Sequence, residues 1–310
     1  MDKKKLIVVA GPTASGKTAV SVALAKKIQG EIISADSMQV YKYMDIGSAK
    51  ITKEQMEGVA HHLIDVLEPD EDFSVHRFQM MAKKAMDSIY AKQATPIIAG
   101  GTGFYIQSVV NDIDFSQTDE QAHVRRQVEE YFEKYGGDGL HTWLAKVDAQ
   151  SASKIHPNNV KRVCRALEYY LLTGEKMSAH NAKQQAKSSP YDVTFIVLTM
   201  DRGLLYERIN QRVDQMIEQG LVDEVKYLRE KGYTKEMTSM QGLGYKEIFD
   251  YLEGRITLEE AIYIIKRDTR RFAKRQLTWF RREKNVQWIH VDQFAFDVEA
   301  IAEAIMKLIG

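Results

Sequence analysis

A phosphate-binding loop close to the N-terminus constrains the fold of this chain more than any other feature. It comprises Gly11, Pro12, Thr13, Ala14, Ser15, Gly16, Lys17 and Thr18, and it directly follows the apolar run Leu6–Ala10. Such a loop between a strand and a helix points successive backbone N–H groups at phosphate oxygens, with the positive end of the helix behind them. The lysine neutralises the distal phosphates and the following hydroxyl holds Mg²⁺. The sequence therefore predicts a diphosphate-bearing ligand, Mg²⁺ as cofactor and Thr18 as a metal ligand.

Short β-branched runs alternate with helical patterns through the first third of the chain. We expect strands at Leu6–Ala10, Glu31–Ala35, His62–Val66 and Pro96–Ala99, helices at Ala19–Ile28 and Val75–Tyr90, and later strands at Val193–Thr199 and Val286–Val291. This alternation predicts an α/β fold in which a parallel sheet carries helices on both faces.

The middle of the chain has a different pattern. Residues 113–190 contain helical patterns at Gln121–Tyr135 and Val160–Leu172 and a polar tract, Asn181–Ser189, which we interpret as mobile or solvated. They contain no convincing strand. We therefore predict a core of residues 1–112 and 191–310 with a helical domain inserted at 113–190.

Composition excludes several classes of protein. Acidic and basic residues balance at 43 each, so total charge alone predicts no polyanionic partner. A single cysteine, Cys164, cannot form an internal disulfide, and a packing role is favoured because no histidine lies in the neighbouring turns. No signal peptide or membrane span is expected, which favours the cytoplasm. The sequence has no heptad repeat that would indicate a coiled-coil oligomer, so we expect a monomer.

Polar residues that follow the strands are the candidates for chemistry, because ligands bind beyond the carboxyl ends of parallel strands. Asp36 follows the second strand and is a candidate general base or metal-associated carboxylate, with a turn-capping role as the alternative. The run Gly100–Gly103 allows the backbone to approach a ligand and presents the Thr102 hydroxyl, but it could equally form a tight turn. The pair His61 and His62 has no third ligand at a suitable spacing, so we expect no metal site there.

A basic helix is expected near the C-terminus. Residues 258–284 read as one helix with an apolar side, and most of the opposite arc is cationic: Arg267, Arg270, Arg271, Lys274, Arg275, Arg281 and Arg282. Asp268 and Glu283 are almost the only acids within this helix that could neutralise them. The pattern indicates contact with a phosphate backbone, with Arg271, Lys274 and Arg275 as candidates, and a solvated helix face is the alternative.

Two smaller basic clusters favour the same kind of partner. Lys161, Arg162 and Arg165 form one cluster in the inserted region. Arg208 and Arg212 form the other, one helical turn apart, from which they could reach phosphates in the crevice. An arginine pair on a helix surface is the alternative for the second cluster.

Taken together, these segments resemble the tRNA dimethylallyltransferase family, also called tRNA isopentenyltransferases. The matching motifs are G-P-T-A-S-G-K-T at 11–18, D-S-M-Q-V-Y at 36–41, G-G-T-G-F-Y at 100–105, H-P-N-N-V-K-R-V-C-R-A-L-E at 156–168, R-I-N-Q-R at 208–212, Q-G-L-G-Y at 241–245 and R-R-F-A-K-R-Q-L-T-W at 270–279. They occur in the family's order and cover essentially the whole chain. The zinc finger of eukaryotic members is not expected, because one cysteine cannot supply it.

The resemblance implies transfer of a dimethylallyl group from dimethylallyl diphosphate to N6 of adenine 37, in the anticodon stem-loop of tRNA. It assigns deprotonation of the adenine amine to Asp36, a place beside the adenine to Thr102, and diphosphate or magnesium contacts to Lys17, Thr18 and Arg212. It places tRNA contacts at Asp36, Ser37, Met38 and Gln39, at Arg125, at Lys161, Arg162, Val163, Cys164 and Arg165, and at Gln241, Gly242, Leu243, Gly244, Tyr245 and Lys246.

Two other classes of function share the phosphate-binding loop. A small-molecule kinase, or an isopentenyltransferase acting on free adenine nucleotides, would use Lys17, Thr18 and Asp36 in similar ways, but neither explains a basic helix and a helical insertion. A non-catalytic RNA-binding module would explain the cations and lack turnover. The reaction itself therefore discriminates among the three.

Overall fold

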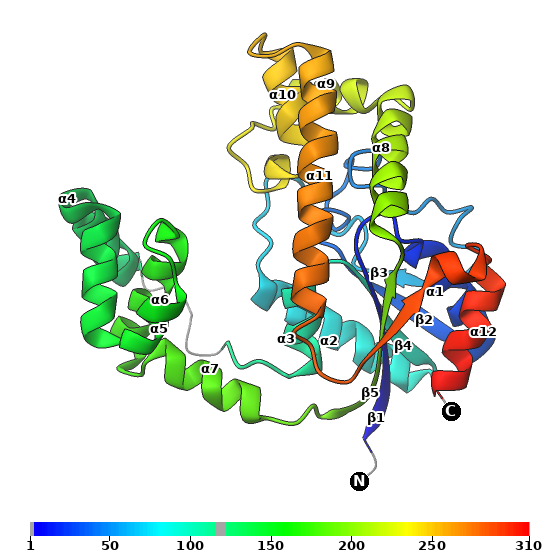
Figure 1. The fold of residues 1–310 in the computed structure, drawn as a ribbon, viewed down its shortest axis with the longest axis horizontal. Coiled ribbons are helices and arrows are strands. Elements are labelled where there is room, and N and C mark those ends of the chain that lie inside the picture. Colours follow the sequence, from blue (N-terminus) through cyan, green and yellow to red (C-terminus); the bar gives the residue numbers. More distant parts are fainter. Residues whose placement is uncertain (1–2, 116–121, 310) are drawn as a thin grey trace. The chain divides into compact units, whose positions relative to one another are not determined.

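The computed structural model describes residues 3–115 and 122–309, which form two compact units. The first unit comprises residues Met1–Val110 and Pro190–Gly310, and the second comprises Asn111–Ser189, close to the inserted region expected at 113–190. Figure 1 shows the first unit with its central sheet and the second as a group of green helices.

The first unit is built on a six-stranded, entirely parallel sheet, which confirms the predicted α/β class. The strand order is β3-β2-β4-β1-β5-β6. The strands are β1 (Lys4–Ala10), β2 (Gly30–Ala35), β3 (His61–His62), β4 (Thr95–Gly100), β5 (Tyr191–Thr199) and β6 (Val286–His290). Because β1 is central and buried on both faces, the phosphate-binding loop leaves the sheet at its middle.

Helices cover both faces of this sheet, and alternate residues of β1 show which helices lie on each. Ile7 and Val9 pack in one apolar cluster with α1 (Lys17–Ile28), α12 (Val298–Ile309) and the first half of α8 (Arg202–Glu218). Leu6 and Val8 pack in another with α2 (Val75–Ala91) and α3 (Gly103–Val110). The alternation follows from the two-residue side-chain period of a strand.

The remaining helices of the first unit are α9 (Leu221–Glu230), the short turn Ser239–Gln241, α10 (Tyr245–Leu252), α11 (Leu258–Phe280) and the turn Val291–Phe294. Helix α11 begins with a capping box, in which Thr257 and Glu260 satisfy each other's backbone N–H groups. It ends at Phe280, four residues before the predicted end at Lys284, and residues after Phe280 form a turn that leads to β6. It runs beside α8 (Figure 1).

The second unit contains only helices among its described residues. They are α4 (Ala122–Val147), which is interrupted at Gly136, α5 (Ala149–Lys154), α6 (Val160–Thr173) and α7 (Met177–Ala186). The predicted helix start at Gln121 lies outside the described residues. An apolar cluster that includes Val128, Leu144 and Val163 gives this unit a core of its own.

One local prediction was wrong. The expected strand His62–Val66 is reduced to β3, because Leu63 and Asp65 have φ values of 63° and 55°, which strand pairing does not allow. The polar tract Asn181–Ser189, interpreted as mobile or solvated, begins within α7 (Met177–Ala186), and most of its described residues are exposed to solvent. No helix in the described part of the chain is both long and apolar enough to cross a membrane.

Candidate active site

A cavity of about 110 Å³ opens at the carboxyl ends of β1, β2 and β4. It brings together candidate residues from distant parts of the sequence. Its polar lining includes Thr13, Lys17, Thr18, Ser34, Asp36, Gln39, Arg212 and Gln276, and its apolar lining includes Ile32, Ile51, Ile64 and Ala99. Thr102 is not among the lining residues; its backbone N–H donates to the Ala35 carbonyl (3.2 Å), which places it beside the end of β2.

The phosphate-binding loop is held with its lysine folded inward. The Lys17 ammonium donates to the Pro12 carbonyl (2.7 Å). Burial and, to a smaller extent, the Arg212 guanidinium lower the pKa of Lys17 to about 7, although the Asp36 carboxylate opposes both effects. The buried Ser15 hydroxyl has no hydrogen-bond partner among the described residues. A loop with an unpaired hydroxyl and a destabilised ammonium is suited to an anion that supplies both missing interactions.

The two arginines of α8 have different roles. Arg212 lines the cavity, and its guanidinium remains charged although burial lowers its pKa, because an arginine does not deprotonate in proteins. Arg208 instead donates from Nε to the Ala14 carbonyl (3.1 Å) and lies over the Phe296 ring. The expectation that both arginines reach phosphates is therefore corrected: Arg208 holds the loop backbone.

Asp36 is fixed at the end of β2 by its own turn. Its Oδ1 accepts the Met38 N–H (2.8 Å), with a longer contact from the Gln39 N–H (3.4 Å). This is the turn-capping arrangement considered as an alternative, and it coexists with a place on the cavity wall beside Lys17 and Arg212. A capped carboxylate that still faces a cavity has a defined orientation toward a ligand.

Gln276 of α11 joins the two loops that border the cavity, a role that the sequence analysis missed. Its Oε1 accepts the Thr13 N–H and its Nε2 donates to the Gly101 carbonyl, both at 3.0 Å, and the residue is only 7% exposed. A Cβ on Gly101 would lie 2.1 Å from Gln276 Nε2, so a side chain at this position would displace the glutamine amide. The one signal in the sequence is a glutamine on the apolar side of the helix.

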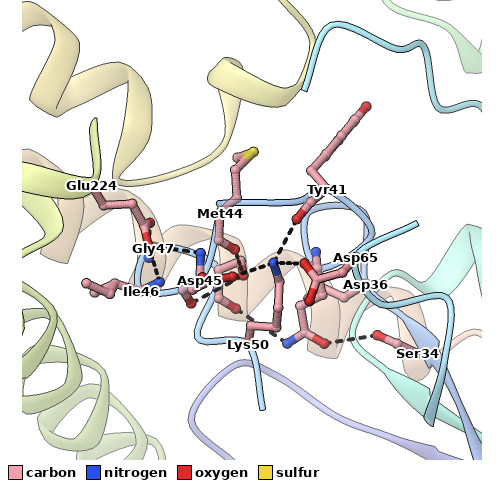
Figure 2. Close-up of polar contacts among 12 residues, drawn as sticks. Ser34, Asp36, Tyr41, Met44, Asp45, Ile46, Gly47, Lys50, Asp65 and Glu224 are labelled. Atoms are coloured by element: carbon pink, nitrogen blue, oxygen red, sulfur yellow. Dashed lines mark hydrogen bonds and ion pairs between the residues drawn. The ribbon is translucent and has the colours of Figure 1, made fainter. Parts of the chain in front are cut away.

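The segment that follows Asp36 is a closed network of hydrogen bonds (Figure 2). The Gln39 amide accepts from the Ser34 hydroxyl (3.0 Å) and donates to the carbonyls of Ser48 (3.4 Å) and Ala49 (3.3 Å). The Lys50 side chain is 4% exposed and donates to the Tyr41 carbonyl and the Asp65 carboxylate. The side-chain amide of Gln39 is therefore used in internal hydrogen bonds, although the residue also lines the cavity, and its tRNA contact stays a prediction.

A second, shallow groove of about 470 Å³ lies along α11 and has a cationic wall. Its lining residues are Arg271, Lys274, Arg275, Thr278, Trp279 and Arg282. Nearer the start of the helix, Lys266 pairs with Asp214 of α8 (2.6 Å) and Arg267 with Asp268 (2.9 Å). Asp214 was not foreseen as a partner. The second half of the helix therefore carries the exposed positive charge.

Comparison with known proteins identifies the family. A model of the IPP transferase family matches residues 39–283. A tRNA dimethylallyltransferase from Lachnoclostridium phytofermentans is 54% identical over 303 residues, which cover 98% of this chain and 97% of the relative. The chain belongs to the tRNA dimethylallyltransferase family.

Solved structures of family members have the same fold. A tRNA isopentenylpyrophosphate transferase from Bacillus halodurans is 47% identical, with a TM-score of 0.74, and the match covers 99% of this chain and 97% of the other. A eukaryotic dimethylallyltransferase acting on tRNA is 32% identical, with a TM-score of 0.85, and the match covers 97% of this chain and 78% of the other.

Several residues assigned to tRNA from the family resemblance are buried. Val163 lies in the core of the second unit, and Tyr245 lies in the core of the first; both are 0% exposed. Gly242 and Gly244 are buried as well. The side chains of Val163 and Tyr245 pack inside the protein and the two glycines have none, so a direct tRNA contact at these four positions stays a prediction.

Other family-derived positions are accessible. Lys161, Arg162 and Arg165 lie on the outer surface of α6, Arg125 pairs loosely with Glu129 (3.7 Å), and Ser37, Met38, Gln241, Leu243 and Lys246 are at least partly exposed. Cys164 is half-buried, and burial raises the pKa of its thiol, which disfavours a nucleophile.

The histidine pair is used for structure. His62 contacts the Glu31 carboxylate (2.7 Å) and His61 contacts the Val59 carbonyl (2.9 Å). Within residues 3–115 and 122–309, no group of three His, Cys, Asp or Glu side chains is arranged to hold a metal by itself.

Proposed function

We propose that this protein transfers a dimethylallyl group from dimethylallyl diphosphate to N6 of adenine 37 in the anticodon stem-loop of tRNA, acting as a monomer. The observation that carries the proposal is the shared cavity: a carboxylate, Asp36, lines the same space as the phosphate-binding loop and Arg212. A base and an anion cradle in one cavity suit a displacement in which a diphosphate leaves as an amine attacks.

The phosphate-binding loop binds the diphosphate and stabilises it as the leaving group. Lys17 and Arg212 stabilise the charge that develops on the leaving oxygen as the C1–O bond breaks. The Ser15 hydroxyl and the N-terminus of α1 complete the cradle. The apolar lining of the cavity, Ile32, Ile51 and Ile64, offers a dry wall for the isoprenoid.

The residues of the loop also suit Mg²⁺. Thr18 lines the cavity beside Lys17, and its hydroxyl would hold the ion. When bound, the ion would add to the neutralisation of the leaving group.

Asp36 activates the nucleophile, which is the adenine amine. The exocyclic amine of adenine is a weak nucleophile until its proton is taken up by a base. As the N6–C1 bond forms, the Asp36 carboxylate accepts the N6 proton and diphosphate departs with the electron pair of the broken C1–O bond. We expect Thr102, whose backbone N–H donates to the Ala35 carbonyl at the end of β2, to contact the adenine.

We assign RNA binding to exposed basic side chains. Arg271, Lys274 and Arg275 line the groove on α11, where an RNA phosphate backbone would meet exposed positive charge, although Arg271 also pairs with Asp268 (3.1 Å). The accessible cations Arg125, Lys161, Arg162 and Arg165 of the second unit, and Ser37, Met38, Gln241, Leu243 and Lys246 of the first, extend the proposed RNA contacts. A target in a loop can be splayed out of its stack at modest cost.

A turnover assay tests the reaction. We expect N6-dimethylallyladenosine to form when purified protein is incubated with Mg²⁺, dimethylallyl diphosphate and unmodified tRNA. The nucleosides of the digested tRNA are analysed by mass spectrometry. A tRNA with guanosine at position 37 is the matched control and should remain unmodified. Product formed from free AMP but not from tRNA, or phosphoryl transfer from added ATP, would replace this proposal with one of the small-molecule alternatives.

A further inference from the structure

One carboxylate holds a turn in the segment that carries Asp36. Glu224, on α9, accepts three consecutive backbone N–H groups: Oε2 accepts from Asp45 (2.9 Å) and Ile46 (2.7 Å), and Oε1 accepts from Gly47 (3.1 Å). Figure 2 shows Glu224 facing this turn. Convergent backbone N–H groups form an anion-binding turn, and here the protein supplies the anion.

Tyr245 completes this anchor from the start of α10. Its hydroxyl donates to Glu224 Oε1 (2.8 Å), and burial together with the carboxylate raises its pKa well above the usual value, so it remains a donor. The ring lies against Gly47, where an added Cβ would be 2.5 Å from the ring carbon Cζ. Residue 47 must therefore be glycine, and the turn, Glu224 and Tyr245 interlock.

The anchored turn is connected to the catalytic carboxylate. The carbonyls of Ser48 and Ala49, directly after the turn, accept from the Gln39 side-chain amide. The backbone N–H of Gln39 in turn lies 3.4 Å from Asp36 Oδ1. Gly47, Ser48 and Gln39 therefore connect Glu224 to Asp36, which lines the cavity.

The charge of Glu224 is not used in an ion pair. The ion pairs among the described residues do not include it, and its hydrogen bonds with described residues go to the turn and to Tyr245. A carboxylate gives stronger hydrogen bonds than a neutral acceptor, so it can fix this turn against alternative conformations.

We propose that Glu224, supported by Tyr245, is a positioning residue that sets the orientation of Asp36 for proton removal from the adenine amine. The inference rests on the proposed function, in which Asp36 is the base. It also gives the Gln241–Lys246 motif an indirect role, because its tyrosine acts on the 36–50 segment and not on RNA.

The test is Glu224→Gln, which keeps the shape but turns an NH₂ group toward backbone N–H donors. We expect kcat for tRNA prenylation to fall by about 10- to 100-fold, the effect of a small misplacement of a catalytic group, while KM for dimethylallyl diphosphate changes by less than about twofold. Glu230→Gln, an exposed residue on the same helix, is the matched control and should behave as wild type. Wild-type kcat in Glu224→Gln would overturn the inference.

Two further measurements separate positioning from general stability. In the Asp36→Ala background, Glu224→Gln should lower the residual rate by less than about twofold, because coupled residues are not additive; an undiminished effect would refute the inference. Hydrogen exchange of peptides spanning 36–41 and 45–47 should accelerate in Glu224→Gln, and unchanged exchange at 36–41 would refute it even if the wild type failed to prenylate tRNA.

Tyr245→Phe provides the milder variant if Glu224→Gln fails to fold. It removes a single hydrogen bond and leaves the packing on Gly47 intact. We expect kcat to fall by about 2- to 10-fold, the equivalent of about 0.5–1.5 kcal/mol for one hydrogen bond, with faster exchange at 36–41. Wild-type values of both would overturn the inference.

Discussion

The cavity and the groove on α11 both concentrate positive charge, but they hold it in different ways. In the cavity, burial lowers the pKa of Lys17 and of Arg212, and the carboxylate of Asp36 lies near both. In the groove, Lys274, Arg275 and Arg282 are exposed to solvent. Buried cations act at short range on one small anion, whereas exposed cations act through a field that salt screens. The first arrangement suits a leaving group and the second suits a polymer backbone.

The largest expected effect belongs to the cavity. Asp36→Ala removes the proposed base, so kcat for prenylation of tRNA should fall by about 10²- to 10⁴-fold. Binding of inorganic diphosphate, measured by calorimetry, should change little because the phosphate-binding loop is intact. Asp70→Ala, an exposed carboxylate, is the control. Near-normal turnover in Asp36→Ala would show that the cavity does not supply the base.

Binding of tRNA at the groove should depend on salt concentration, whereas binding of an anion in the cavity should not. Arg271→Glu combined with Arg275→Glu removes two phosphate contacts, so tRNA affinity at about 50 mM salt should weaken on the order of 100-fold and approach the wild-type value near 1 M. The charge-matched control, Lys84→Glu with Lys307→Glu, changes α2 and α12 and should have little effect on affinity. Equal losses in both double variants would mean that total charge, and not the groove, binds RNA.

The glutamine that joins the two loops should affect the cavity alone. Gln276→Leu leaves the Thr13 N–H and the Gly101 carbonyl without their partner, which should lower the free energy of unfolding by about 1–2 kcal/mol and weaken diphosphate binding. Chemical denaturation and calorimetry measure the two effects. Gln287→Leu, on exposed strand β6, is the control. Unchanged tRNA affinity alongside weaker diphosphate binding would separate the two regions.

The smallest effect concerns pH. Diphosphate favours the charged form of Lys17, whose pKa in the free protein is about 7, so binding takes up a proton above that pH. Affinity for inorganic diphosphate should therefore fall as pH rises from about 7 to 9, by at most about tenfold per unit. Lys17→Arg, which stays charged, should flatten the profile. A flat wild-type profile would contradict the lowered pKa.

The sheet could be predicted from the sequence because its signals are local. The apolar run before the phosphate-binding loop became β1, and the run Pro96–Ala99 became the centre of β4. The predicted strand at His62–Val66 failed because Leu63 and Asp65 have positive φ values, which strand pairing excludes. Helix α11 ends at Phe280, and the prediction extended it to Lys284 because the basic residues after Phe280 continue the polar pattern of the helix in the sequence.

The site could be predicted only where one motif carried the chemistry. Asp36 and Lys17 follow strands, so topology alone brings them together. Glu224 and Gln276 gave no such signal, because their partners lie 177 and 263 residues away along the chain and only the tertiary structure shows the contacts. The buried tyrosine of the Gln241–Lys246 motif illustrates the same point. The motif indicates that this region matters for function, but it does not show whether a residue contacts RNA or supports the structure of the site.

The link between Thr13 and Gln276 also has a consequence for biosynthesis. The loop leaves the ribosome early, but its partner is made 263 residues later. At typical elongation rates of about 5–20 residues per second, the interval is on the order of tens of seconds. During that time a nascent chain carries a phosphate-binding loop without its brace, so the finished cradle forms only when almost the entire protein has been translated.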